Sequence, residues 1–236
     1  MILPRFSVNQ DVLKIVALLT MTIDHIAKYF PLGIFSDIGR SVGRISFPIF
    51  SFLLIEHLHK KQIFKKYIFR LAGFGMLTFL LLWPYQGLLK ENTALPFNIM
   101  ISFLITVLTL FVFVWMKKEN APIWIKIPVA FFNIVCFAVV SMGCQYSVPG
   151  FLFMLFLYFY FERQTYLNLF FVLLFSALIN LGHEFHWVIS LLTTVFLLRT
   201  YQNQNAVRLL KHWWTFYLYY PLHLWFLASL AYTLMY

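Results

Sequence analysis

Residues 97–116 read FNIMISFLITVLTLFVFVWM, a run without one charged side chain that ends at Lys117 and Lys118. A helix that crosses a bilayer needs about 20 mainly apolar residues, so this run predicts a membrane span. Similar runs recur along the 236-residue chain, which is 62% hydrophobic and only 11% charged. A soluble domain is roughly a quarter charged, because polar groups must cover its surface. The sequence therefore predicts an all-α, polytopic transmembrane helix bundle.

The apolar runs are separated by short loops, which predicts a single membrane domain over residues 1–236. We expect about nine spans, with about eight to ten as the range. They cover residues 12–30, 42–58, 68–84, 97–116, 123–141, 148–161, 166–181, 186–198 and 213–235.

Lysines and arginines gather in or beside the loops after the second, fourth, sixth and eighth runs. They are Lys60, Lys61, Lys65, Lys66, Arg70, Lys117, Lys118, Lys126, Arg163, Arg199, Arg208 and Lys211. Cytoplasmic loops carry this excess in membrane proteins, so these loops and the N-terminus are predicted to be cytoplasmic. The first loop is an exception, because Lys28, Arg40 and Arg44 lie on the side predicted to be outside. The net charge of +10 thus reflects orientation, and we expect no nucleic-acid partner.

Several common catalytic motifs are missing from the sequence. It has no Walker A loop, GxGxxG fingerprint, GxSxG elbow or HExxH pair, which removes the usual support for ATP-driven transport, dinucleotide cofactors and zinc proteolysis. Cys136 and Cys144 form no metal-binding pattern. His183 and His186 flank Glu184, but a zinc site normally needs three positioned protein ligands. We expect solvated polar residues there and no metal.

The first span carries ionisable residues at a depth where a charged side chain costs roughly 2.5 to 3.5 kcal/mol. Helical spacing places four side chains on one stripe: Lys14, Met21, His25 and Lys28. Asp24 lies at the edge of this stripe, which we expect to face protein or a water-filled cavity. An ordinary Asp24–Lys28 pair beside a merely hydrogen-bonded histidine explains the same spacing equally well.

Two arginines, Arg40 and Arg44, lie at the outer end of the second span, where Pro48 cannot donate to the carbonyl of Arg44. A guanidinium there either binds an anion, orients a carboxylate or snorkels to the interface. Three further polar residues are predicted at the same outer level: Asn98, Tyr146 and Glu184. Together with Arg40 they are our candidates for binding a substrate.

The last span holds His223 near the middle of the membrane, two residues after Pro221. A lone intramembrane histidine is often structural. This one follows a proline that leaves the carbonyl of Tyr217 without its helical donor, so a functional role stays open.

Three stretches resemble signatures of the TraX family, whose namesake acetylates the N-terminus of conjugative pilin. Residues 13–26, LKIVALLTMTIDHI, resemble the family's opening helix, and residues 43–52, GRISFPIFSF, resemble its second-helix signature. Residues 220–224, YPLHL, resemble its C-terminal signature. The three occur in family order and span nearly the whole chain. One departure is Gln145-Tyr146-Ser147, where many relatives have Asp-Tyr-Gly, and it weakens the transfer of a role to this loop.

The resemblance implies a multi-pass protein of the bacterial inner membrane, related to the transmembrane acyltransferases. It implies acyl transfer from acetyl-CoA or another acyl-CoA to an outer acceptor, such as the pilin N-terminus or a surface glycan. His25 would be the catalytic base, and four further residues occupy signature positions: Asp24, Arg44, Tyr220 and His223.

The chemistry of these side chains suits acyl transfer. A neutral histidine can take the proton of an attacking amine or hydroxyl, and Arg44 or Tyr220 can stabilise the oxyanion. Asp24 cannot easily orient His25, because neighbours on a helix point about 100° apart. We therefore expect a carboxylate from another segment, with Glu184 as a candidate.

The nucleotide of acyl-CoA is expected at the basic second loop, which includes Lys65, Lys66 and Arg70. Setting the orientation of the chain is an alternative role for the same residues. A secondary transporter and a non-enzymatic assembly protein, each embedded in membrane lipid, are the alternative functions.

Overall fold

The computed structural model describes residues 8–31, 33–85, 98–118, 122–142, 146–180, 185–201 and 214–235. These residues form helices and short connections, without a strand, which confirms the predicted all-α fold. The helices are α1 (Gln10–Tyr29), α2 (Ile34–Gly43), α3 (Ser46–Lys61), α4 (Phe64–Leu82), η1 (Trp83–Tyr85), α5 (Ile99–Lys118), α6 (Ile123–Met142), α7 (Ser147–Glu162), α8 (Tyr166–Leu178), α9 (His186–Thr200) and α10 (Trp214–Met235).

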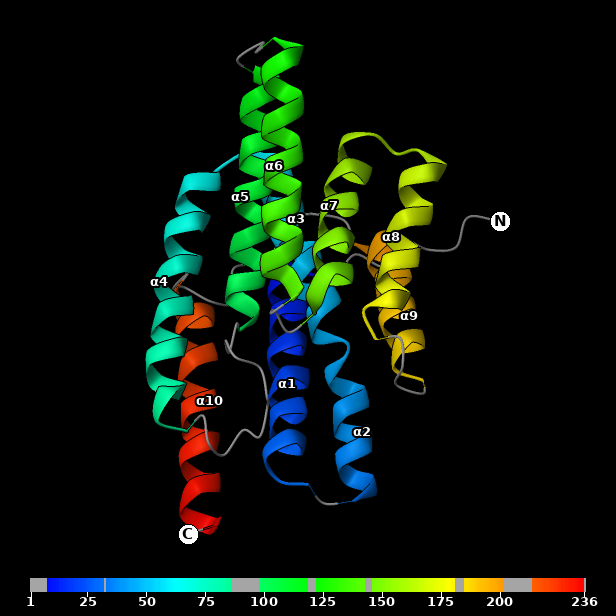
Figure 1. The fold of residues 1–236 in the computed structure, drawn as a ribbon. Helices are drawn as coiled ribbons and strands as arrows, with labels where there is room; N and C mark the ends of the chain where they lie inside the picture. The colour runs from blue at the N-terminus through cyan, green and yellow to red at the C-terminus, as the bar shows by residue number, and fades with distance from the viewer. Residues whose placement is uncertain are drawn as a thin grey trace, which may run out of the picture.

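The helices run side by side as an up-and-down bundle (Figure 1). Helix α1 contacts α2, α3 and α10, while α4 packs against both α5 and α10. Three helical stretches of the described chain are long and apolar enough to cross a membrane, namely Ile34–Lys61, Phe64–Tyr85 and Ile99–Lys118. Large apolar side chains such as Phe69, Phe131 and Leu192 are more than 60% exposed, as lipid-facing groups are. The fold is therefore that of a membrane protein.

Helix α2 corrects the prediction that a loop joins the first two spans. Residues 34–43 are helical instead, and the α2–α3 stretch includes a turn at Arg44 and Ile45. Helix α2 lies close against α1 because two of its glycines, Gly39 and Gly43, lack side chains. A Cβ on Gly39 would stand 2.7 Å from the Cβ of Ala27, and one on Gly43 would stand 2.2 Å from that of Asp24. Small residues four apart are the signal that permits such a close helix contact in membranes.

Pro48 does not interrupt a helix. Helix α3 begins at Ser46, so Pro48 lies in its first turn. An N–H at that position has no partner within its own helix, and proline costs no hydrogen bond there. The interruption of the helix thus lies at the turn before α3.

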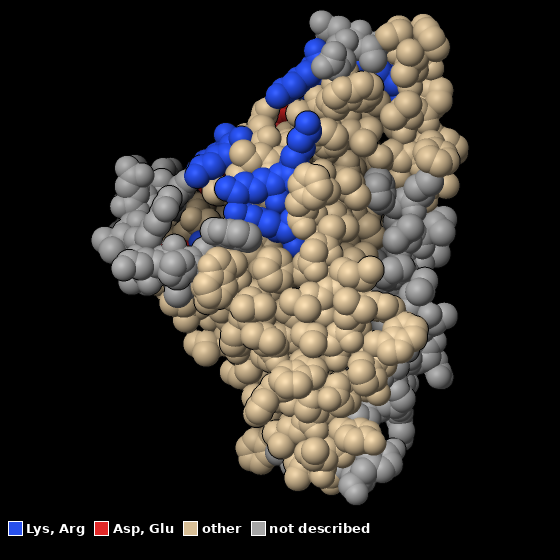
Figure 2. Space-filling model, turned by 90° about the vertical axis from the view of Figure 1, so that its left-hand side faces the viewer, with Lys and Arg blue, Asp and Glu red and all other residues tan. Residues whose placement is uncertain are grey.

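Most basic residues lie toward one end of the bundle, whereas Lys28, Arg40 and Arg44 lie at the end of α1 or in the α2–α3 stretch. The α3–α4, α5–α6 and α7–α8 connections lie at the upper end in Figure 1. On the face drawn in Figure 2, lysines and arginines gather in the upper half, while the lower half is free of them among the described residues. This separation of charge agrees with the predicted alternation of loops.

Candidate active site

A pair of buried histidines joins α1 to α10. His25 Nδ1 lies 2.8 Å from His223 Nε2, and His223 Nδ1 lies 2.8 Å from the carbonyl oxygen of Tyr219. A carbonyl can only accept, so His223 Nδ1 carries the proton, and in the neutral ring Nε2 is then an acceptor. His25 Nδ1 must therefore donate to it. The remaining nitrogen of His25, Nε2, keeps its lone pair and has no hydrogen-bond partner in the part of the chain that the structure describes.

Aromatic side chains hold this pair in place. The Tyr219 ring stacks on His223 with centroids 4.9 Å apart, and its hydroxyl lies 2.7 Å from Thr22 Oγ1. Tyr220 approaches His25 edge-on at 6.3 Å. His25 and His223 are 6% and 9% exposed, so little water competes for their hydrogen bonds. The arrangement favours one tautomer and one orientation of His25.

On the other edge of α1, Asp24 is 4% exposed and forms an ion pair with Arg40 of α2, with Oδ1 and Nη1 3.0 Å apart. Arg44, also buried, lies within electrostatic reach of Asp24, His25 and Tyr146. The structure thus brings four predicted residues together in what we call the arginine cluster. Its members are Asp24, Arg40, Arg44 and Tyr146.

Two further residues, Asn98 and Glu184, were predicted to bind a substrate. Asn98 caps α5, accepting from the N–H groups of Met100 and Ile101, and its amide donates to the carbonyl of Gly75. Its polar atoms are thus engaged in linking α5 to α4. Glu184 lies outside the described residues.

The expected carboxylate partner of His25 is replaced at Nδ1 by the imidazole of His223. The described part of the chain assembles no group of three side chains that could hold a metal.

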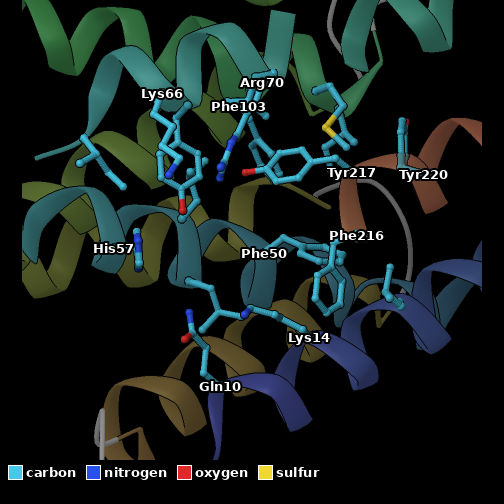
Figure 3. Close-up of a pocket in the computed structure, with 18 of the residues that line it drawn as sticks. Gln10, Lys14, Phe50, His57, Lys66, Arg70, Phe103, Phe216, Tyr217 and Tyr220 are labelled. Atoms are coloured by element: carbon cyan, nitrogen blue, oxygen red, sulfur yellow. The ribbon is translucent and has the colours of Figure 1, made fainter. Parts of the chain in front are cut away.

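A cavity of about 500 Å³ opens between α1, α3, α4, α5 and α10 (Figure 3). At one end its wall is polar and basic, with Gln10, Lys14, His57, Lys61, Lys66 and Arg70. The rest of its wall is mainly apolar and aromatic and includes Met21, Met100, Phe103 and Tyr220. Lys66 and Arg70 were predicted to bind the donor, whereas the neighbouring Lys65 is not part of the wall.

Aromatic rings position two of the cations in this cavity. The Arg70 guanidinium lies 6.0 Å from the Tyr217 ring centroid and is hydrogen-bonded to the Tyr217 hydroxyl. Lys14 Nζ lies 5.3 Å from the ring centroid of Phe216 and 3.0 Å from Asp11 Oδ1. Figure 3 shows Lys14 approaching from the side opposite Lys66 and Arg70.

Sequence reasoning left Lys14 and His57 without a role in this cavity. The only signal for Lys14 was its place on the stripe with Met21 and His25, which was predicted to face protein or water. Lys14 and Met21 do line the cavity, and His25 lies just beyond Tyr220, which both lines the cavity and contacts His25.

No curated protein and no solved structure matches the sequence. The family described as TraX protein matches residues 9–231, which is nearly the whole chain and includes the histidine pair, the arginine cluster and the cavity. The chain therefore belongs to the TraX family.

Proposed function

We propose that this membrane protein transfers an acetyl or other short acyl group from acyl-CoA to an amine or hydroxyl acceptor. The donor binds from the cytoplasmic side, and the acceptor, a pilin N-terminus or a surface glycan, binds on the outer side. One observation carries the proposal: His25 shares its Nδ1 proton with His223, which leaves the Nε2 lone pair unbonded among the described residues, and the His25 ring contacts Tyr220 of the cavity wall. A general base beside a cavity that can hold the donor is what acyl transfer requires.

In the proposed reaction the acceptor's nitrogen or oxygen attacks the thioester carbonyl while His25 Nε2 takes its proton. The tetrahedral intermediate then collapses, the carbon–sulfur bond breaks, and His25 returns the proton to the departing CoA thiolate. His223 supports both steps, because its Nε2 accepts from His25 Nδ1 and stabilises the transient imidazolium. His223 is thus a positioning residue, whereas His25 is the catalytic residue.

The donor would bind in the cavity in one orientation, with its nucleotide at the basic end. Phosphate groups bind well to cationic side chains, and four of these line the basic end of the cavity: Lys14, Lys61, Lys66 and Arg70. From Lys14 to His25 the helical rise is about 16 Å, which an extended pantetheine arm spans. The thioester would thus lie beside Tyr220 with the nucleotide at the basic end.

The arginine cluster would serve the acceptor and the oxyanion. Arg44 is 7% exposed, and its Nε has no hydrogen-bond partner among the described residues. A buried N–H without a partner is available to a developing oxyanion or to an acidic group on the acceptor. Asp24 fixes Arg40 rather than His25, so its role is to hold α2 and the cluster in place.

Turnover of radiolabelled acetyl-CoA by purified protein in nanodiscs tests this proposal. We expect Lys66→Ala and Arg70→Ala to raise the KM for acetyl-CoA, since each removes a cation from the cavity wall. Lys65→Ala is the matched control, because it removes the same charge from the same helix outside the wall. A transporter or an assembly protein would release no CoA, and no turnover with any acyl-CoA would overturn the proposal.

Sidedness needs its own measurement. With both native cysteines replaced by serine, an impermeant maleimide applied to intact cells should label Phe185→Cys, a site that is 74% exposed at the start of α9. The same reagent should label Lys61→Cys only after the membrane is opened. The reverse pattern would place the basic end of the cavity outside, where cytoplasmic acyl-CoA has no access.

A further inference from the structure

The arginine cluster has more positive than negative charge. Asp24 forms an ion pair with Arg40, and Lys28 and Arg44 also lie within electrostatic reach of its carboxylate. Arg44 itself forms no ion pair with a carboxylate in the part of the chain that the structure describes. One carboxylate thus faces two guanidinium groups, and the cluster keeps a net positive charge.

Burial makes this charge costly to leave without a partner. Arg44 is 7% exposed, and its Nε–H has no hydrogen-bond acceptor among the described residues. Buried cations in proteins are normally paired with an anion and hydrogen-bonded to it. A guanidinium group presents its N–H donors in a planar fork that matches carboxylate and phosphate oxygens. Arg44 therefore has both the charge and the donor capacity to bind an oxyanion group.

Close packing fixes the turn that carries Arg44. A Cβ on the preceding Gly43 would stand 2.2 Å from the Cβ of Asp24, so the turn lies directly against α1. Ser46 Oγ donates to the Gly43 carbonyl at 2.8 Å, which ties the turn to the start of α3. Arg44 is thus held in place between α1, α2 and α3.

The two sides of the cluster differ in exposure. Tyr146, next to the start of α7, is 7% exposed and packs on Phe47 with ring centroids 4.0 Å apart. In contrast, the side chain of Arg40 is 31% exposed. Arg40 therefore marks the side from which an anionic group can enter, and the loop pattern predicts that side to be external.

We infer that the arginine cluster binds an oxyanion group, a carboxylate or a phosphate, that the acceptor carries. This inference rests on the proposed function and names its acceptor class, which is an amine or alcohol with a negative charge near its nucleophile. Asp24 neutralises Arg40, so Arg44 supplies the charge that the ligand balances. Because Arg44 lies within electrostatic reach of His25, an acceptor bound there stays near the base.

Inorganic phosphate is the probe for a binding test that needs no turnover. The full-length protein is purified in dodecyl maltoside, which contains no phosphate, and saturating CoA is added to occupy the basic cavity. A ligand that binds the folded state raises the Tm, so phosphate should raise the Tm of the wild-type protein. Arg44→Gln should abolish this rise. Arg163→Gln is the matched control, because it removes the same charge from an exposed position just after α7.

Asp24→Asn provides a second variant in case Arg44→Gln does not fold. It removes the carboxylate that pairs with Arg40, so a second guanidinium group becomes available to phosphate. The Kd for phosphate should fall about tenfold, as expected for an added hydrogen bond between charged groups. A cluster with a purely structural role would lose stability in this variant without binding phosphate more tightly.

Two amines test whether the bound anion belongs to the acceptor. Ethanolamine and phosphoethanolamine differ by one phosphate group, and kcat/KM for acyl transfer from acetyl-CoA should be at least about tenfold higher for phosphoethanolamine. In Arg44→Gln the two amines should become equivalent, mainly because the KM for phosphoethanolamine rises.

The outcomes separate this inference from the function beneath it. A phosphate-dependent rise in Tm that persists in Arg44→Gln would overturn the inference, as would the absence of a rise in the wild-type protein. Phosphate binding that depends on Arg44, with equal kcat/KM for the two amines, would assign the site to a lipid headgroup and overturn the acceptor assignment. Absence of turnover with every acyl-CoA would overturn the proposed function, and the inference with it, even where phosphate binds.

Discussion

Two buried polar networks join helices of this bundle, and they differ in what they leave unbonded. Between α8 and α9, Ser176 Oγ lies 2.7 Å from Thr194 Oγ1, and both hydroxyls lie within 3.0 Å of the Ser190 carbonyl. Asn180 donates to the Ser190 hydroxyl. Between α1 and α10, His25 Nδ1 donates to His223 Nε2, and His223 Nδ1 donates to the carbonyl of Tyr219. The other ring nitrogen of His25, Nε2, takes no part in this chain of hydrogen bonds.

The comparison separates a structural network from a reactive one. The side chains of the α8–α9 network bond to one another and to backbone, which is what an apolar surrounding demands of buried polar groups. The α1–α10 network ends on a basic nitrogen, and the ring that carries it contacts Tyr220 of the cavity wall. Hydroxyls and amides stabilise a helix contact without exchanging protons near neutral pH, whereas imidazole can exchange them.

The largest expected effect comes from removing the unbonded nitrogen. His25→Ala should lower kcat/KM for acetyl transfer by about 10²- to 10⁴-fold, the usual contribution of a general base. Insertion and folding should persist, because the change takes a polar group out of an apolar helix. His59→Ala is the control, since that ring packs against Tyr158 and Phe161 rather than in the site. Near-normal turnover in His25→Ala would show that the α1–α10 network is structural, like the α8–α9 network.

The next effect concerns the partner of His25. His223→Phe keeps a ring but removes the acceptor of His25 Nδ1–H, so the other tautomer becomes accessible, and kcat should fall about 10²-fold with little change in KM. His223→Gln offers a carbonyl oxygen in that position and should retain more activity than the phenylalanine variant. Steady-state kinetics of both variants decide the point: equal losses would mean that His223 only fills space.

A smaller effect tests the support for the arginine cluster. Gly43→Ala puts a Cβ 2.2 Å from that of Asp24, and overpacking of this kind costs about 1 to 3 kcal/mol. The Tm in detergent should fall accordingly. Gly73→Ala is the matched control, because a Cβ on that helical glycine meets nothing within 4 Å and should stabilise the helix by about 0.5 to 1 kcal/mol. Equal Tm values for the two variants would argue against a close α1–α2 contact.

The smallest effect belongs to the α8–α9 network. Ser176→Ala removes one of its hydroxyls, and hydrogen bonds between membrane helices average about 0.6 kcal/mol. The Tm should fall slightly while kcat and KM for acetyl-CoA stay at wild-type values. A loss of turnover comparable with that of the His223 variants would show that this network belongs to the site.

Much of the candidate site could be predicted from spacing along single helices. The stripe that includes Lys14, Met21 and His25 was expected to face protein or water, and the first two line the cavity. In contrast, α2 was predicted as a loop, because residues 34–43 are too few and too mixed to suggest a span. Its helix is stabilised by the glycine contact with α1, and that contact is tertiary.

The sequence by itself determined the membrane class, the helical fold and the segregation of charge. These follow from local physics, since a bilayer requires each apolar run to satisfy its backbone internally and keeps lysine and arginine near the water. Only the tertiary structure decided which nitrogen of His25 is unbonded. Its partner lies 198 residues away, and the tautomer depends on the Tyr219 carbonyl that faces that partner. A hydrogen bond between distant helices depends on how they pack, which no spacing within one helix contains.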